Sequence, residues 1–208
     1  MSYLNNPAEI YARSFAIVRA EADLSHLDPA VHEIAIRIIH ACGMTEIAPD
    51  LRITPDAAAA MRAALAAARP VFTDCEMVRH GIIPRALPPG VTTICTLNDP
   101  RAKPIGLAQN ITRSAAAISL WGAELHGAIA VIGNAPTALF ALLEAISSGG
   151  PRPACIVGLP VGFVGAAEAK AELVANPRGI AYVTLRGRRG GSAMAAAAVN
   201  AVGLERAA

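Results

Sequence analysis

The sequence predicts an α/β fold with three α/β/α layers, a mainly parallel sheet and a helical N-terminal third. In the second half of the chain, three short apolar runs are each followed by a helix-patterned segment of about a dozen residues. Consecutive strand–helix units of this kind form parallel sheets with right-handed crossovers and helices on both faces. In the first third, apolar residues recur mainly at helical spacing. A length of 208 residues fits one domain, so we expect residues 1–208 to form a single domain.

Three helices are expected in the N-terminal third, at residues 6–21, 28–43 and 54–70. Each begins at a residue that suits a helix N-terminus, with a proline directly after that residue. Gly43 suits the left-handed backbone that closes the second helix. The third helix is expected to stop at Pro70, because proline cannot continue a helix.

Short β-rich runs are expected at residues 70–74 and 92–97, before a helical segment at 110–125. The alternating units then begin with the strands "GAIAVIG", "PACIVGLP" and "IAYVTLRG". Ligands of such sheets bind beyond the carboxyl ends of the strands, where this chain has the loops "GNAPT", "GLPVGFVGAAE" and "RGRRGGS". We expect these loops to direct backbone N–H groups toward an anionic ligand. Their glycines also suit plain turns, and the loops match neither a phosphate-loop nor a dinucleotide motif.

Composition and charge exclude several classes of function. The net charge of +2 is too small to indicate nucleic acid binding. No apolar run approaches the roughly 20 residues of a membrane-spanning helix, and the first residues lack a signal-peptide pattern, so we expect a cytoplasmic protein with no membrane partner. The scattered cysteines and histidines argue against a disulfide framework or a bound metal. Every basic residue except Lys103 and Lys170 is arginine, which reflects either compositional bias or a need to bind carboxylates bidentately.

The stretch "RIIHACG", residues 37–43, places a histidine in the last turn of the second expected helix. His40 is there either as a core residue or as a proton donor, and the local pattern leaves both readings open. The negative end of the helix dipole favours the imidazolium form, whereas the charge of Arg37, one turn earlier, opposes it.

A set of motifs together resembles the precorrin-8X methylmutase family of the corrin pathway. They are "YARSFAIVRAEADLS", "RIIHACG", "DCEMVRHGI", "ICTLNDP", "NITRSAAAISLW", "GNAPTALFALLE", "GLPVGFVGAAEAK" and "RGRRGGSAM", and they extend from Tyr11 to Met194. The resemblance implies an isomerase that moves a methyl group from C-11 to C-12 of a contracted tetrapyrrole to give hydrogenobyrinic acid. It also implies a homodimer with the active site at or near the subunit interface. Within that site His40 would be the catalytic acid, and Ser14 and Arg37 would contact the substrate nearby.

The chemistry of this reaction fits the residues of the chain. A methyl shift around a conjugated ring needs no nucleophile, metal or cofactor, and one general acid contributes roughly 10²–10⁴-fold. Histidine suits that role because its unperturbed pKa is about 6.5. A polycarboxylate tetrapyrrole also needs several separate anchors around an apolar floor. The candidates for these anchors are Arg13, Arg37, Arg113, Arg186, Arg188 and Arg189, the turn from Asn134 to Thr137, and the turn that comprises Gly190, Gly191 and Ser192.

Other readings stay open from the residues alone. The cobalt-dependent route uses a metallated substrate, which would make the chain a cobalt-precorrin-8 methylmutase, but the fuller match to the metal-free branch favours precorrin-8X. A corrinoid-binding carrier protein without turnover is the alternative from a different class, and a generic enzyme for a phosphorylated ligand is a third. His80 is a further candidate for ligand contact, whereas Asp74 and Glu76 are placed outside the catalytic set, in a hinge or supporting role.

Overall fold

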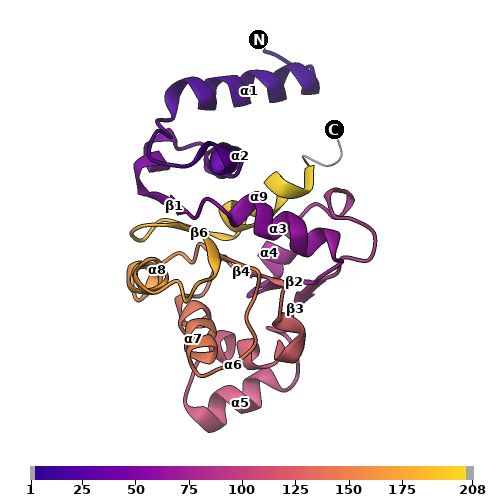
Figure 1. Ribbon diagram of the computed structural model, residues 1–208, viewed down its shortest axis with the longest axis vertical. Coiled ribbons are helices and arrows are strands. Elements are labelled where there is room, and N and C mark those ends of the chain that lie inside the picture. The colour runs from indigo at the N-terminus through magenta and orange to yellow at the C-terminus, as the bar shows by residue number, and fades with distance from the viewer. Residues whose placement is uncertain (1–2, 205–208) are drawn as a thin grey trace.

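The structure is a computed structural model that describes residues 3–204 (Figure 1). Within those residues the strands form one sheet in the order β1-β6-β5-β4-β2-β3. Neighbouring strands run parallel, except that β1 pairs antiparallel with β6 at one edge. The strands are β1 (Leu51–Ile53), β2 (Val71–Thr73), β3 (Thr93–Cys95), β4 (Ile129–Ile132), β5 (Cys155–Gly158) and β6 (Ala181–Leu185). The prediction of a mainly parallel sheet is confirmed, with one antiparallel edge strand that the pattern did not indicate.

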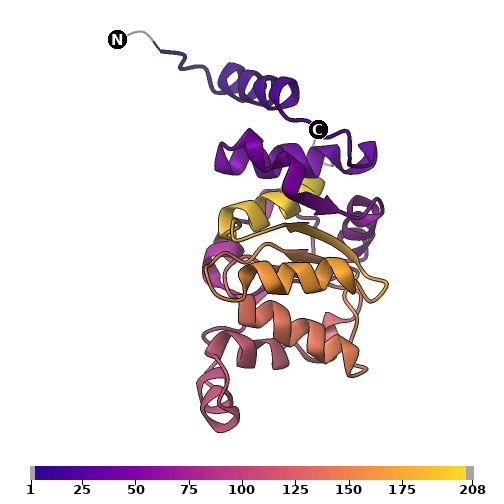
Figure 2. The ribbon, with the colours of Figure 1, turned by 90° about the vertical axis from the view of Figure 1, so that its left-hand side faces the viewer.

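Helices cover both faces of the sheet, which confirms the three layers (Figures 1 and 2). Helices α2, α3, α4 and α9 pack on one face, and α6, α7 and α8 on the other. The α-helices are α1 (Pro7–Glu21), α2 (His32–Cys42), α3 (Ala57–Ala66), α4 (Glu76–Gly81), α5 (Ala102–Gln109), α6 (Arg113–Ser119), α7 (Pro136–Ser147), α8 (Ala166–Ala175) and α9 (Ser192–Leu204). Short 3-10 helices span Pro29–Val31, Thr45–Asp50, Pro84–Ala86 and Gly122–Leu125. Among residues 3–204 no helix has the length and apolar character needed to cross a membrane.

Two clusters of buried apolar side chains hold the layers of the described chain together. One contains Ile129 and Val131 of β4 with the inner faces of α2, α3 and α9. The other contains Ala130 and Ile132 of the same strand with the inner faces of α7 and α8. Neighbouring side chains of a strand point to opposite faces, so a strand between two helical layers must be apolar throughout. This requirement explains the continuous apolar runs from which the sheet was predicted.

Helix α1 lies outside the three layers and packs on α2 (Figure 2). Asn6 caps α1, since its side-chain oxygen accepts hydrogen bonds from the N–H groups of Ala8 at 3.0 Å and Glu9 at 3.2 Å. The second expected helix is divided, because a 3-10 turn capped by Asp28 precedes α2. It ends as predicted at Gly43, whose φ is 68°. The middle of α1 faces the last turns of α2, where Ser14 of α1 contacts His40 of α2.

Helices α4 and α5 are not apparent from the sequence pattern. Helix α5 contains Pro104 and Gly106, which disfavour a helix interior. Pro104 lies in the first turn, where its missing N–H costs no helical hydrogen bond. At Gly106 an added Cβ would lie 3.1 Å from the carbonyl oxygen of Ile111, so the close approach of the next turn favours glycine. Tertiary contacts here outweigh local propensity. The helix expected at 110–125 is likewise shorter, comprising α6 and a 3-10 turn.

Candidate active site

His40 lies in the last turn of α2 and borders a cavity between α2, α4 and α9. Its Nδ1 is 2.9 Å from the hydroxyl oxygen of Ser14 on α1. Its Nε2 has no hydrogen-bond partner among residues 3–204. The cavity has a volume of about 330 Å³ and is lined by Arg37, His40, Ala41, Gly81, Ala193, Ala196, Ala197 and Asn200. The imidazole is half-buried, with Nδ1 hydrogen-bonded to Ser14 and Nε2 available to a ligand in the cavity. The interpretation of His40 as a residue of the hydrophobic core is therefore not supported.

Two aromatic rings and an arginine surround the imidazole. The Phe15 ring centroid lies 4.6 Å from that of His40, and the Tyr11 ring lies 4.5 Å from that of Phe15. The Arg37 guanidinium sits 5.1 Å from the Phe15 centroid and donates a hydrogen bond to the Tyr11 hydroxyl. Residues 11, 14 and 15 occupy positions i, i+3 and i+4 of α1, so all three side chains face α2. Tyr11 and Phe15 were not among the predicted site residues, although the spacing within "YARSF" could have indicated them.

The surroundings of His40 disfavour its charged form in the free protein. Burial lowers the pKa of His40, and the positive charge of Arg37 lowers it further. The helix dipole acts in the opposite direction, because the negative end at the last turn favours imidazolium. A carboxylate bound at Arg37 would offset the arginine charge, so the protonation of His40 is sensitive to an anionic ligand.

The wall of the cavity opposite α2 is held by an amide side chain that the sequence did not indicate. Asn200 on α9 accepts a hydrogen bond from the N–H of Ile83 and donates one to the carbonyl of Gly81, both at 2.9 Å. An added Cβ at Gly81 would lie 2.8 Å from the Cβ of Ala196, so α4 and α9 approach more closely than a larger residue would permit. The amide of Asn200 thus fixes the end of α4 that borders the site.

Asp74 organises the loop that follows β4. Its carboxylate accepts hydrogen bonds from the N–H groups of Gly133 at 2.9 Å, Asn134 at 3.0 Å and Ala135 at 2.8 Å. The side chain is buried, and burial raises its pKa while the N–H donors act in the opposite direction. The expectation that this turn offers N–H groups to a substrate anion is therefore wrong for residues 133–135, because Asp74 already occupies them. The side chain of Asn134 is exposed, and its contact with substrate stays a prediction.

The loops that follow β5 and β6 are tied to each other at the carboxyl edge of the sheet. The N–H of Gly162 donates to the carbonyl of Arg188 at 3.2 Å, and the N–H of Gly191 donates to that of Leu159 at 2.8 Å. The Arg188 guanidinium lies 5.5 Å from the centroid of the Phe163 ring, which is 85% exposed. This pair of loops forms a rim that is both apolar and cationic, and we call it the carboxyl-edge rim.

The carboxyl-edge rim leads directly into the His40 cavity. Ser192, the first residue of α9, has its hydroxyl oxygen 3.4 Å from the thiol sulfur of Cys75. The next residue along α9 lines the cavity. Arg189 of the rim lies close to Cys42, which is two residues beyond His40. Burial raises the pKa of the Cys42 thiol, and the positive charge of Arg189 acts in the opposite direction. The rim and the imidazole therefore belong to one region of the surface.

Comparison with known proteins identifies the family. The family model for precorrin-8X methylmutase matches residues 9–204 of the chain. The precorrin-8X methylmutase of Pseudomonas aeruginosa is 50% identical over 206 residues, which cover 99% of each protein. The chain belongs to the precorrin-8X methylmutase family.

Other relatives and solved structures agree with this membership. A precorrin-8X methylmutase of a Sinorhizobium species is 50% identical over 200 residues, covering 96% of this chain and 95% of that protein. The cobalt-precorrin-8 methylmutase of Salmonella typhimurium is 37% identical over 210 residues, covering 97% of each. The crystal structure of a precorrin-8X methylmutase from Thermus thermophilus superposes with a TM-score of 0.84 at 34% identity, covering 95% of each chain. The fold is thus that of solved precorrin-8X methylmutases.

The structure brings together three of the residues suggested by the resemblance to precorrin-8X methylmutases, namely Ser14, Arg37 and His40. Arg13 is exposed on α1, and Arg186 is exposed and borders a separate hollow beside α8. Their contact with substrate stays a prediction. The side chain of His80 is 71% exposed and does not line the His40 cavity.

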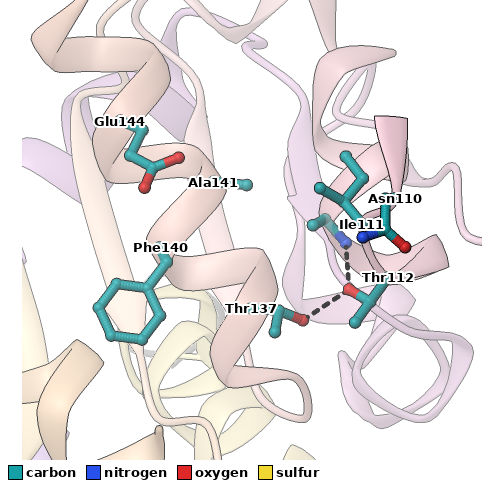
Figure 3. A pocket seen from close by; sticks show the side chains of 8 residues that line it. Asn110, Ile111, Thr112, Thr137, Phe140, Ala141 and Glu144 are labelled. Carbon is teal, nitrogen blue, oxygen red and sulfur yellow. Dashed lines mark hydrogen bonds between the residues drawn. The ribbon is translucent and has the colours of Figure 1, made fainter. Parts of the chain in front are cut away.

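Two predicted residues lie on the opposite face of the sheet from His40. The hydroxyl of Thr137 on α7 is 2.8 Å from that of Thr112, and both border a second cavity of about 340 Å³ (Figure 3). Arg113 is exposed at the start of α6, next to this cavity. Helices α6 and α7 cover the face away from α2, so a single copy of the chain does not bring Arg113 or Thr137 to the imidazole (Figure 1).

Proposed function

We propose that this chain catalyses the isomerisation of precorrin-8X to hydrogenobyrinic acid in cobalamin biosynthesis, with His40 as general acid. The reaction moves a methyl group from C-11 to C-12 of the macrocycle. The observation that carries the proposal is an imidazole held by Ser14 beside an open cavity, in a chain 50% identical to a precorrin-8X methylmutase over 206 residues. The rearrangement is internal to the substrate, so we propose no cofactor.

Protonation of the macrocycle withdraws electron density from the conjugated system and favours migration of the methyl group. In the imidazolium form, Nδ1–H of His40 donates to Ser14, and Nε2–H is the proton that the ligand receives. After transfer the neutral ring keeps its Nδ1–H, which still donates to the Ser14 oxygen, and the bare Nε2 takes a proton back as the product forms, because isomerisation leaves the formula of the substrate unchanged. The Ser14 oxygen accepts from Nδ1–H before and after the transfer, so it supports His40 in both protonation states.

Arg37 links substrate binding to the acid. Its guanidinium is held against Phe15 by the Tyr11 hydroxyl, close to the imidazole. A substrate carboxylate that pairs with Arg37 would cancel the charge that lowers the pKa of His40. The imidazole would then gain its proton when the polycarboxylate substrate is bound, which is when the reaction requires it.

We also propose that a second copy of the chain completes the active site. The His40 cavity of about 330 Å³ is at the lower end of the range for drug-sized ligands, and a macrocycle with its carboxylate arms is larger. Ile10 and Ile17 are 44% and 46% exposed, and they share a face of α1 near this cavity. Co-expression of His40→Ala and Arg113→Ala subunits tests the arrangement. Mixed dimers would regain activity if each site combined His40 of one copy with Arg113 of the other, and would remain inactive if it did not.

The identities support the metal-free substrate. The two precorrin-8X methylmutases are 50% identical to the chain, against 37% for the cobalt-precorrin-8 methylmutase of Salmonella typhimurium. A carrier that binds a corrinoid without turnover would convert at most one equivalent of substrate. The proposed enzyme would convert a large excess. A cytoplasmic location completes the proposal, in keeping with membership of a biosynthetic enzyme family.

The proposal is tested by the ultraviolet-visible spectrum after mixing with metal-free precorrin-8X. Wild type should convert excess substrate to the red hydrogenobyrinic acid, whereas His40→Ala should bind it and convert it roughly 10²–10⁴-fold more slowly. His126→Ala removes an exposed histidine outside the site and should match wild type. Equal conversion by wild type and His40→Ala would show that the proton comes from another group.

A further inference from the structure

A buried lysine lies beneath the carboxyl-edge rim and has no part in the proposed proton transfer. Lys170 is on the second turn of α8, and its side chain is 0% exposed, although lysine is rarely buried without an acidic partner. Its Nζ donates a hydrogen bond to the backbone carbonyl of Arg189. No carboxylate within residues 3–204 forms an ion pair with it. Burying an ammonium against a neutral carbonyl is costly, so packing alone does not account for this residue.

The loop above Lys170 is constrained on both sides of the carbonyl that it holds. The Arg189 guanidinium is 3.0 Å from the carboxylate of Asp50. At Gly190 an added Cβ would lie 2.5 Å from the carbonyl oxygen of Leu159, so the backbones of the two loops are in direct contact. The chain then enters α9, which lines the His40 cavity. A shift of the Arg189 carbonyl would therefore move the rim and the start of α9 together.

We propose that Lys170 is a positioning residue that holds the Arg186–Ser192 loop in place for a polycarboxylate tetrapyrrole and adds positive charge beneath it. The inference rests on the proposed function and extends it to a group that does not touch the ligand. Lys170 acts through the Arg189 carbonyl, which fixes the arginines of the rim. It also acts through its charge, since a cation under the loop favours a bound polyanion.

The charge of Lys170 makes this role depend on pH. Burial lowers the pKa of Lys170 to about 8 in the free protein, so the amine is mostly protonated at neutral pH. A bound polyanion favours the charged amine and so raises the pKa of Lys170. The contribution of Lys170 to ligand affinity is therefore fully present below about pH 8 and is lost as pH rises through the pKa of the bound form. The charged and titratable groups on the segments around Lys170 are Glu168 and Glu172 of α8, Glu144 of α7, Tyr182 of β6, and Arg186, Arg188 and Arg189 of the loop.

The chain offers an internal control, because Lys103 is its only other lysine. Lys103 is exposed on α5, which packs on α6 away from the carboxyl-edge rim (Figure 1). Carbon-13 labelling of lysine would give one side-chain signal for each residue in the intact protein. The Lys170 signal should titrate near pH 8, and its midpoint should rise when hydrogenobyrinic acid is added. The Lys103 signal should not respond to that ligand.

Substitution distinguishes the effect of Lys170 on ligand affinity from the effects of the other titrating groups. Lys170→Met places an apolar side chain of similar length in the buried site, and Lys103→Met is the matched control. We expect Lys170→Met to bind hydrogenobyrinic acid at least about tenfold more weakly at pH 7 and to lack the alkaline loss of affinity. Lys103→Met should follow wild type at every pH. Circular dichroism would establish that both variants fold, and the wild-type lysine titration decides the question if Lys170→Met does not.

The outcomes distinguish this inference from the proposed function. If wild type neither binds hydrogenobyrinic acid nor converts precorrin-8X, the proposed function fails, and the role of Lys170 fails with it. If wild type binds and converts but Lys170→Met has the same affinity and pH dependence, only the role of Lys170 is overturned. A Lys170 signal whose midpoint does not move on addition of ligand would overturn it equally.

Discussion

The contact between Ser14 and His40 provides the sharpest test of how the site holds its proposed acid. Ser14→Ala removes one hydrogen bond of 2.9 Å and leaves α1 intact, because alanine favours a helix. A hydrogen bond between neutral groups contributes about 0.5–1.5 kcal/mol, whereas one to a charged group contributes about 1.5–3 kcal/mol. The smaller value applies to the neutral imidazole of the free protein and the larger one to the imidazolium that donates the proton. The two values differ by about 1 kcal/mol, so we expect the rate constant to fall roughly five- to tenfold.

Single-turnover conversion of precorrin-8X, followed by absorbance at several enzyme concentrations, measures this loss. The rate constant should fall while the apparent binding constant changes little, because Ser14 contacts the imidazole and its loss lowers the fraction of bound protein in which His40 carries the proton. Ser14→Thr keeps a hydroxyl and should retain most of the activity. Ser119→Ala is the matched control, since that exposed helical hydroxyl donates to the carbonyl of Ala116 at 2.7 Å. A rate within twofold of wild type for Ser14→Ala would refute the reasoning, as would weaker binding with an unchanged rate constant.

Other substitutions test the groups that support the site. Asp74→Ala leaves three N–H groups of the loop after β4 without an acceptor, so the free energy of unfolding in urea should fall by about 3–5 kcal/mol; a loss below about 1 kcal/mol would contradict that role. Arg37→Met removes the charge that lowers the pKa of His40, so the histidine titration measured by NMR should move to higher pH, and an unchanged or lower midpoint would exclude the electrostatic link. Gly133→Ala would place a Cβ 2.5 Å from a methyl of Val78 on α4, so the free energy of unfolding measured by thermal denaturation should fall by about 1–3 kcal/mol. Wild-type stability would mean that α4 can shift away from the added methyl group at no energetic cost.

Much of the fold could be predicted because its signals are local in the chain. The strands β4, β5 and β6 are short apolar runs, and the helix ends at Asn6 and Gly43 carry residues whose side chain or backbone suits a cap. The strand β1 was not predicted, because three residues that pair at the edge of a sheet leave no periodic pattern. Helix α5 was not predicted either, because Pro104 and Gly106 are unfavourable by propensity and are stabilised by the turn that follows.

The sequence by itself determined the family and the fold class, and it proposed Ser14, Arg37 and His40 as site residues, because each of these signals lies within a short motif. Only the tertiary structure decided which groups meet. Asp74 accepts hydrogen bonds from a loop 59 to 61 residues later, and Lys170 lies buried beneath the carbonyl of a residue in the next loop. The pKa and the binding role of such groups depend on burial and on neighbours that are distant in the chain. Periodicity and local motifs carry no information about those contacts, and so these supporting groups became visible only once the chain was folded.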